Sequence, residues 1–487
     1  MRGKWQIRIG TGHILAAAAA AVPLLVMAVV GKHPVDLTPE AHFWPVLLAA
    51  GTAAIVAAGL TVAGVRARDG RTILLGTAFS TTTALLAVHG FATPGVVVEV
   101  NGVIALAGGA SLPVGAGLLA LTALPGLRQP RRIAPLLVLQ AVLATGVLTL
   151  GALALATPTL VPMVPKAGSP PATALLVFGL SCLAVLVHRA LRTHALTRRP
   201  ADLLVVAGCV WLGVSLYSQL QLGPGTAAFY GGHAMELGGI AMIGIPTVLD
   251  LARGGASRPL IGDLTAPELV AASEAFLGPR VRSLLVRLVE RDSSTAEHTR
   301  RVALLAARVG EELKLPAALR RDLAVGGLLH DIGKLSVPLE ILRKPGPLDD
   351  AEFTEIRRHP EAGRRLLEEL GGFPDTVRRL VSDHHERLDG TGYPRGLQSG
   401  DLPLETRILT ACDVYDALVS DRVYRPAWPA ERALALLHEE SGSGYDATVV
   451  EALARIVKPE SGAPSWVAGL AAPEAPGIPG LPGFRRA

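Results

Sequence analysis

The C-terminal third of the chain holds a set of histidines and aspartates that could bind metal ions. His330-Asp331 opens the segment HDIGK, and His384-His385 opens the segment HHERLDGTGYP. Imidazole nitrogens and carboxylate oxygens, with no thiolate, are the ligand set of a hydrolytic two-metal centre. Such a centre activates water near neutral pH and neutralises the charge of a phosphate. The seven candidate ligands are His298, His330, Asp331, His359, His384, His385 and Asp413.

The segment that contains these residues, 291–458, has the composition of a soluble, charge-rich domain. Its apolar residues recur at three- and four-residue spacing, as in Val302, Leu305 and Val309, which is typical of helices. No alternating strand pattern competes with this spacing, and Gly and Pro cluster in loops such as 390–396. The sequence therefore predicts an all-α domain.

The first half of the chain has a very different composition. Half of the 487 residues are hydrophobic and only 18% are charged, whereas a soluble protein carries about a quarter charged residues. Residues 1–250 are nearly free of Asp and Glu, and they contain apolar runs of the length, about 17–25 residues, that crosses a bilayer. We expect eight membrane helices, near residues 13–31, 43–65, 72–92, 102–124, 133–156, 171–188, 203–220 and 229–250.

The distribution of Lys and Arg predicts the orientation of these helices. Basic residues cluster at the amino terminus and in the second, fourth and sixth loops, whereas the intervening loops offer only Lys32 and Lys166. We therefore expect a multi-pass protein of the inner (plasma) membrane, with its amino terminus and everything after residue 250 in the cytoplasm. A cleaved signal peptide at the start is the alternative, but no convincing cleavage site follows it. The net charge of +5 then reflects topology and gives no indication of binding to a nucleic-acid duplex.

The changes in composition divide the chain into four expected parts. They are a membrane sensor region at 1–250, a helical connector at 251–290, the metal-binding domain at 291–458 and a disordered Pro/Gly-rich tail at 459–487. The three cysteines include no CxxC pair, so neither a disulfide framework nor a zinc finger is indicated.

The C-terminal segment resembles an HD-GYP domain, a subgroup of the HD superfamily of metal-dependent phosphohydrolases. The resemblance covers about a third of the chain and rests on an ordered set of motifs. A single His-Asp pair would be weak support, but the complete ordered set is specific. The motifs are HTRRV at 298–302, HDIGK at 330–334, HP at 359–360, HHERLDGTGYP at 384–394 and the run 407–425.

The resemblance implies a centre of two divalent metal ions, Fe or Mn, bridged by the carboxylate of Asp331. Lys334 lies one helical turn beyond Asp331, and the resemblance implies that it contacts a substrate phosphate. Some family members carry a Glu that helps to hold a third metal where this chain has Ser294, so we expect two metals. The implied ligands of one metal are His298, His330 and Asp413, and those of the other are His359, His384 and His385.

Further residues of these motifs are expected to bind the substrate. Arg422 and Arg425 are spaced for one helix face and are phosphate-binding types, although they could instead be solvated or ion-paired. Glycines around Tyr393-Pro394 would shape a loop at the substrate. Cys412, beside a ligand, is expected to be a small buried thiol, with a redox-sensitive thiol as the alternative. The expected substrate-binding residues are Lys334, Gly392, Tyr393, Pro394, Arg422 and Arg425.

Four histidines of the membrane region fall on the extracytoplasmic side in the expected topology: His33, His42, His89 and His233. Glu236 lies three residues after His233, so the two side chains can share one helix face. One interpretation is that these residues sit at the membrane interface and contact water. The other is an outer-leaflet site for a metal, a haem or a proton, built from His89, His233 and Glu236.

The expected function is a membrane-bound phosphodiesterase that hydrolyses cyclic di-GMP to pGpG, to GMP or to both, under the control of the membrane region. The resemblance leaves two alternatives, which are a phosphodiesterase for another cyclic dinucleotide and an idle receptor that signals by protein contact. No ligand residue is missing, which argues against an idle receptor, and the shortage of intramembrane charge argues against a transporter. A homodimer is possible, and the sequence does not determine the oligomeric state.

Overall fold

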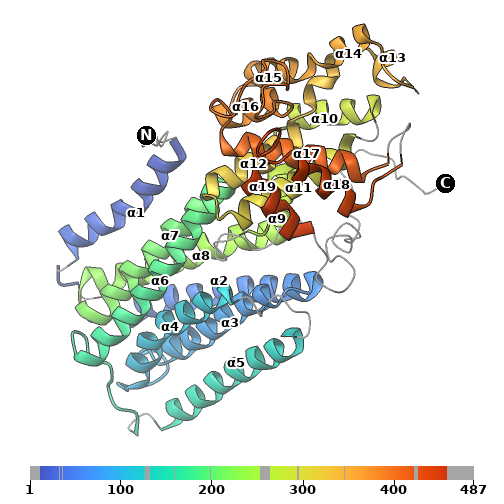
Figure 1. The fold of residues 1–487 in the computed structure, drawn as a ribbon. Coiled ribbons are helices and arrows are strands. Elements are labelled where there is room, and N and C mark those ends of the chain that lie inside the picture. The colour runs from blue at the N-terminus through green and yellow to red at the C-terminus, as the bar shows by residue number, and fades with distance from the viewer. Residues whose placement is uncertain are drawn as a thin grey trace. The chain divides into compact units, whose positions relative to one another are not determined.

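The computed structural model describes residues 11–31, 33–35, 37–124, 127, 132–157, 160–197, 199–252, 264–292, 295–344, 346–421 and 426–457. Every named element within these ranges is a helix, and the few β-bridges are isolated pairs. The all-α fold that the sequence predicts is thus confirmed (Figure 1). The chain divides into two units, Met1–Asp263 and Leu264–Ala487, and each is described by itself.

The described part of the first unit contains eight long α-helices, and each expected membrane segment overlaps one of them. Seven, α2 to α8, are long and apolar enough to cross a membrane, whereas α1 has only a shorter apolar stretch, Ala17–Val29. The helices are α1 (Thr11–Val30), α2 (Pro39–Ala67), α3 (Gly70–Phe91), α4 (Val103–Ala120), α5 (Ile133–Ala156), α6 (Pro170–Thr197), α7 (Pro200–Tyr217) and α8 (Ala227–Ala252).

The connection between α2 and α3 is short and makes the two helices antiparallel neighbours. Arg68 ends α2 with a left-handed backbone conformation, φ 51°. The carboxylate of Asp69 then begins α3 by accepting hydrogen bonds from the backbone N–H groups of Arg71 and Thr72, at 3.1 and 3.3 Å. The start of α2 and the end of α3 therefore lie at the same end of the bundle.

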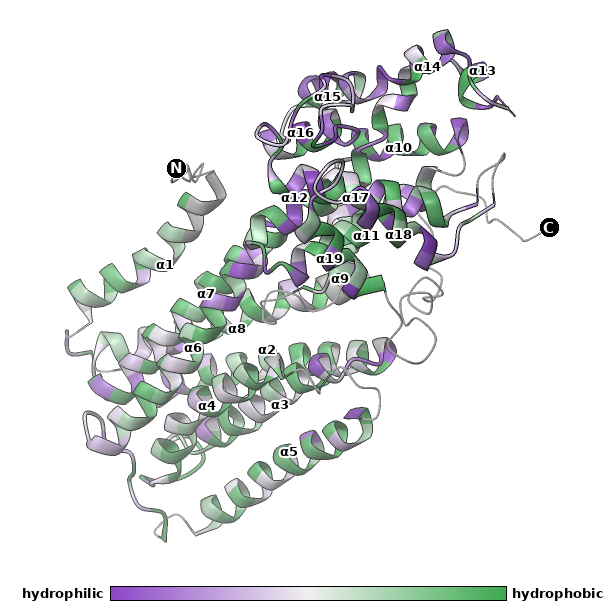
Figure 2. Ribbon diagram, viewed as in Figure 1, coloured by the Kyte–Doolittle hydropathy of each residue, from purple (hydrophilic) through white to green (hydrophobic). Residues whose placement is uncertain are grey.

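Apolar residues predominate along most helices of the first unit (Figure 2), and several of them are exposed. Leu48 and Ile55 on α2 and Leu150 and Leu153 on α5 are all more than half exposed. Exposed apolar surface on this scale is unfavourable in water and is what a lipid bilayer covers. The arrangement supports association of this unit with a membrane.

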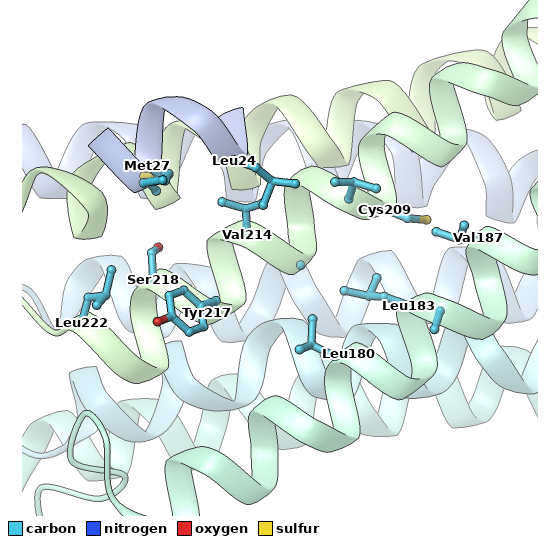
Figure 3. A pocket seen from close by; sticks show the side chains of 14 residues that line it. Leu24, Met27, Leu180, Leu183, Val187, Cys209, Val214, Tyr217, Ser218 and Leu222 are labelled. Carbon is cyan, nitrogen blue, oxygen red and sulfur yellow. The ribbon is translucent and has the colours of Figure 1, made fainter. Parts of the chain in front are cut away.

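An apolar cavity of about 580 Å³ lies in the first unit, beside α1, α6 and α7 (Figure 3). Leu24, Leu183 and Val214 line it, and Tyr217 and Ser218 contribute the hydroxyl groups. None of the predicted metal ligands lies on its wall. The cavity is therefore separate from the predicted metal ligands.

The second unit is a bundle of shorter helices. Residues 266–291 of the expected connector form two helices in this unit, and Leu269 and Val270 of the first are buried there. The helices are α9 (Ala266–Phe276), α10 (Pro279–Arg291), α11 (Thr295–Glu312), α12 (Ala317–Leu329), η6 (Ile332–Ser336), α13 (Leu339–Leu342), α14 (Asp350–Ile356), α15 (His359–Leu370), α16 (Asp375–Asp383), α17 (Leu404–Val419), α18 (Ala430–Glu439) and α19 (Ala447–Val457).

The core of the second unit lies between α11, α17 and α19. Val302, Leu409 and Val450 are fully buried there, and they come from the three helices in turn. Cys412 is also fully buried in this core, and burial raises the pKa of its thiol. The small buried thiol that we expected is therefore what the structure contains. The expected tail, 459–487, lies outside the described residues.

Candidate metal centre

The seven predicted ligands come together in the second unit, although they are far apart in the sequence. They are carried by the first turn of α11, the ends of α12 and α16, the start of α15 and the middle of α17. Two groups of three have ligand atoms within 4.8 Å of one another, and they are the two sets that the resemblance implies. The groups are His298, His330 and Asp413, and His359, His384 and His385.

Asp331 lies between the two groups and turns a different oxygen toward each. Its Oδ1 is 3.4 Å from the Nε2 atom of His359. Its Oδ2 is 3.5 Å from the Nε2 atom of His330 and 3.9 Å from that of His298. Asp331 and His384 also form a compact group with His330. A carboxylate in this position can bridge two cations, one on each side.

Backbone carbonyls fix the rings of three ligands. The Nδ1 atoms of His330, His359 and His384 each lie 2.8 Å from the carbonyl oxygen of the residue three positions earlier. Since a carbonyl can only accept, each Nδ1 carries the proton and donates it. In the neutral ring, the Nε2 atom then carries no proton. Its lone pair is free to bind a metal.

These lone pairs fit a bound cation. The Nε2 atoms of His359 and His384 face each other at 3.2 Å, although neither carries a proton to share. The Nε2 atom of His330 is buried and has no hydrogen-bond partner in the described part of the chain. Buried polar atoms are almost always satisfied, so an orphan of this kind calls for a ligand. The residues present thus suit divalent metal ions.

Asp416 supports the centre from behind, and the sequence reasoning missed it. Its Oδ2 accepts a 2.7 Å hydrogen bond from the Nδ1 atom of His298. Arg301 holds the same carboxylate with two hydrogen bonds, at 2.7 and 3.0 Å. A carboxylate behind a histidine orients the ring and makes its other nitrogen a stronger ligand. The sequence did contain a sign of this arrangement. Arg301 lies three residues after His298 and Asp416 lies three residues after Asp413, so each pair can share one helix face.

The charges of the centre act on Asp331 and on His298 in opposite ways for metal binding. Burial alone would raise the pKa of Asp331, but Lys334 and the imidazoles of His330 and His359 outweigh it and hold that pKa well below its usual range. Burial is also the largest influence on His298 and would lower its pKa. Hydrogen bonds from the ring to aspartates prevail and raise the pKa of His298 to about 9. Below that pH, a metal must displace a proton from His298.

Lys334 lies at the edge of the centre. Its Nζ atom donates a 2.7 Å hydrogen bond to Asp331 Oδ2, and its side chain is 22% exposed. Gly333 allows this turn to approach α15, since a Cβ there would come within 1.9 Å of the carbonyl oxygen of His359. The segment HDIGK thus brings two predicted ligands and an accessible ammonium group together within five residues.

The loop with Gly392, Tyr393 and Pro394 covers the side of the centre formed by His385. The Tyr393 ring lies over the His385 ring, with centroids 4.7 Å apart, and the Tyr393 N–H donates to the His385 carbonyl at 3.1 Å. The guanidinium group of Arg357 lies 4.9 Å from the centre of the Tyr393 ring. The loop thus stands beside the ligands, as a substrate-binding loop would require.

Close packing holds this loop in place. A Cβ on Gly392 would come within 2.5 Å of both the Arg387 nitrogen and the Glu386 Cα. The buried carboxylate of Glu386 accepts hydrogen bonds from the N–H groups of Arg395 and Leu397, at 2.7 and 2.9 Å. Glu386 is a second residue that the sequence reasoning missed, because a Glu directly after two ligands gives no sign of facing its own loop.

Three residues named from the sequence lie outside the described part of the chain. They are the two arginines expected to bind phosphate, Arg422 and Arg425, and Ser294, on which the expectation of two metals depends. Their roles stay predictions.

The first unit brings together the three residues expected to form a sensor site. The rings of His89 and His233 lie with their centroids 5.6 Å apart, and Glu236 Oε2 lies 3.2 Å from His233 Nδ1. His42 joins them, with its Nε2 atom 3.1 Å from that of His233. His33 is exposed and takes no part in this group.

Comparisons with known proteins relate the second unit to an enzyme family. Residues 284–449 match the family model of the HD domain. The chain is 42% identical over 179 residues to a cyclic di-GMP phosphodiesterase of Pseudomonas aeruginosa, a match that covers 37% of this chain and 43% of that relative. It is 42% identical over 159 residues to the 3'3'-cGAMP-specific phosphodiesterase 3 of Vibrio cholerae, covering 33% and 34% of the two chains.

A cyclic di-GMP phosphodiesterase of Thermotoga maritima is 35% identical over 195 residues, which are 40% of this chain and 53% of that relative. The matches thus span about a third to a half of these relatives' own lengths. The ordered motifs and these relatives together identify residues 284–449 as an HD domain of the HD-GYP type, carried by a chain whose other unit consists of apolar helices.

Proposed function

We propose that this chain is a membrane-bound cyclic dinucleotide phosphodiesterase that uses two divalent metal ions, Fe or Mn. The observation that carries the proposal is the position of Asp331, whose two oxygens face two separate groups of histidine and aspartate side chains. The HD domain family is metal-dependent. When bound, the ions would activate a water molecule and neutralise the charge of the phosphate.

The residues around the ligands have roles that follow from their chemistry. Asp416 and the backbone carbonyls hold the imidazoles in the orientation and protonation state that metals need. Lys334 provides an accessible ammonium group next to the bridging carboxylate, where it can bind a non-bridging phosphate oxygen. The loop of Gly392, Tyr393 and Pro394 forms the neighbouring wall, against which the rest of the substrate would lie.

The proposed substrate is cyclic di-GMP, cleaved to pGpG, to GMP or to both. The names of the Pseudomonas and Thermotoga relatives support this choice. The second candidate is 3'3'-cGAMP, because an equally similar Vibrio relative is specific for it. The two molecules differ in one base, so the two-metal centre alone does not distinguish them. An idle receptor is less well supported, because all seven ligand residues are present and brought together.

The proposed location is the inner membrane, with the amino terminus and the HD domain in the cytoplasm and the membrane region acting as a sensor. The apolar helices support membrane association, and the Lys/Arg distribution supports the orientation. Cysteine labelling from either side of right-side-out vesicles tests it, with single cysteines introduced at Lys166 and at Asp375 in a cysteine-free background.

The activity test uses the full-length protein in nanodiscs, loaded with Mn²⁺ or Fe²⁺ without oxygen. Cyclic di-GMP and 3'3'-cGAMP are offered separately, and the products are separated by chromatography. We expect faster turnover of cyclic di-GMP. Elemental analysis of the isolated fragment 255–487, which lacks the first unit, should give about two metal ions per chain. Asp331→Asn should abolish turnover, whereas Asp375→Asn, which changes an 80% exposed aspartate, should not. Undiminished turnover by Asp331→Asn would contradict the two-metal assignment. Light scattering of the same sample measures the oligomeric state.

A further inference from the structure

We propose that the first unit contains a second metal site, in which His42, His89 and His233 bind one divalent transition-metal ion. The three side chains come from α2, α3 and α8, and each is less than 10% exposed. One ring nitrogen of each lies within 4.8 Å of the other two. The site is distinct from the HD domain and does not depend on the function proposed for it.

Hydrogen bonds leave one nitrogen of each ring free to bind a metal. His89 Nδ1 lies 2.8 Å from the carbonyl oxygen of Ile104 and must donate to it. His233 Nδ1 lies 3.2 Å from the carboxylate of Glu236 and donates likewise. In the neutral rings, the Nε2 atoms of His89 and His233 then carry no proton, and each has a lone pair that can bind a metal. His42 Nδ1 lies 3.0 Å from the hydroxyl of Thr93, which can accept its proton in the same way.

Two buried atoms of this cluster have no partner among the described residues. His89 Nε2 is buried without a hydrogen bond, and so is the Oε1 atom of Glu236. Unsatisfied polar atoms inside an apolar helix bundle are costly, and buried carboxylates normally face a positive charge. A cation bound by the three imidazoles would satisfy His89 directly and compensate Glu236 through the ring of His233.

The geometry suits a single ion of the zinc type. Bonds of about 2.0–2.1 Å in a tetrahedral zinc site put neighbouring ligand nitrogens roughly 3.4 Å apart. The Nε2 atoms of His42 and His233 are 3.1 Å apart, so small shifts admit an ion. Three neutral imidazoles favour Zn²⁺, Cu²⁺, Ni²⁺ or Co²⁺ over Mg²⁺ or Ca²⁺. Three protein ligands also leave one position for water or an exchangeable ligand.

The surroundings leave room for an ion but not for a haem. His42 stacks on Phe229 with ring centroids 5.6 Å apart and meets His89 edge to face at 5.0 Å. Helix α4 packs closely against the His89 ring, because a Cβ on Gly108 would come within 2.6 Å of that ring. A flat macrocycle between these rings would require the helices to separate.

The site lies at one end of the helix bundle. His42 is in the first turn of α2, His89 is in the last turn of α3 and His233 is in the second turn of α8. At a rise of 1.5 Å per residue, His233 is about 28 Å from the C-terminal end of α8. The chain continues from that end toward the HD domain. If α8 crosses the membrane, the site is near the face opposite to the one from which the chain continues.

Metal counting on the full-length protein tests the proposal. His330→Ala, Asp331→Ala and His384→Ala first remove a ligand from each group of the HD domain and the carboxylate between them. The protein is then treated with chelator, incubated with Zn²⁺ and desalted. We expect about one Zn²⁺ per chain. Adding His89→Gln and His233→Gln should remove nearly all of it. The matched control is His194→Gln, since His194 is also buried in this unit and bonded to a carbonyl but lies outside the cluster.

Cobalt supplies a readout that does not depend on how the histidine variants fold. Co²⁺ in a tetrahedral site absorbs visible light strongly, and the same His330→Ala/Asp331→Ala/His384→Ala protein should show these bands. Excess Zn²⁺ should remove them. Absence of the bands, or retention of Zn²⁺ by a folded His89→Gln/His233→Gln protein, would overturn the proposal and leave a hydrogen-bonded histidine cluster.

Discussion

The Oδ2 atom of Asp416 lies 2.7 Å from the Nδ1 atom of His298 and fixes the direction in which that ligand faces. Because Arg301 holds both oxygens of Asp416, the carboxylate cannot turn away without losing two charged hydrogen bonds. The Nε2 atom of His298 is thereby held 3.1 Å from Asp413 Oδ1. The positions of His298 and Asp413 in their ligand group are thus set by a chain of contacts that runs between α11 and α17.

Asp416→Ala should therefore weaken metal binding without removing a ligand. Losing such a supporting carboxylate typically costs about 10–100-fold in metal affinity or activity. Turnover measured over a range of Mn²⁺ concentrations should show a higher half-saturating concentration and partial recovery at high metal. Arg301→Lys should show a smaller effect in the same direction. Identical metal dependence in Asp416→Ala and the parent would exclude this supporting role.

Lys334→Ala should impair catalysis while leaving the metals in place. Its ammonium group is the accessible cation beside the bridging carboxylate, and charged hydrogen bonds to a phosphate are worth about 1.5–3 kcal/mol. We expect kcat/KM to fall by about 10–150-fold. Lys334→Arg should recover part of it, because the charge is kept. Elemental analysis provides the control, since loss of metal from Lys334→Ala would assign the residue to the metal centre instead.

Gly392→Ala should displace the loop beside His385. The added methyl group would lie within 2.5 Å of backbone atoms of Arg387 and Glu386, which cannot move independently. Overpacking of this kind costs about 1–3 kcal/mol, so the melting temperature should fall together with turnover. Gly400→Ala is the matched control, because nothing lies within 4 Å of a Cβ at that position. Equal melting temperatures and rates for the two variants would contradict the close packing of the loop.

The metal-free protein should lose stability as the pH rises toward 9. The pKa of His298 is raised from 6.5 to about 9, so its contribution is fully present below pH 6.5 and is lost as the pH rises through about 9. A bound metal needs the neutral ring, and the metal-loaded protein should lack this dependence. Melting curves at several pH values, with chelator and with Mn²⁺, measure the difference. His298→Gln should remove the slope of the chelated sample, and a persistent slope would assign it to another group.

Added Zn²⁺ should change the turnover of the full-length enzyme through the membrane region. The isolated fragment 255–487 should lack this response. We expect this fragment to be soluble, helical and metal-dependent, because the second unit has its own core. Turnover of the full-length protein in proteoliposomes is measured with Zn²⁺ added outside, next to a His89→Ala/His233→Ala variant. A response that is the same in the parent and the variant would show that the histidine cluster does not regulate the enzyme.

The sequence by itself predicted the helical architecture and named the candidate metal ligands. Helical periodicity and apolar runs depend only on the local chain, so the all-α fold and the position of each apolar helix could be predicted. The ends of some helices could not, since α6 continues to Thr197, nine residues beyond the expected end. The seven ligands could be named because their motifs are short and ordered. Their division into two sets came from the family resemblance, since spacing in sequence cannot say which helix ends meet.

Only the tertiary structure decided which side chains face each other. Asp416 and Glu386 are ordinary acidic residues in the sequence, and their partners lie on other helices or in a folded-back loop. The grouping of His42 with His89 and His233 likewise requires the antiparallel packing of α2 and α3 and the position of α8. Periodicity gives the face of a helix on which a residue lies, but the neighbour of that face is set by packing across the whole unit. That is the physical reason why supporting residues were missed while the ligands themselves were not.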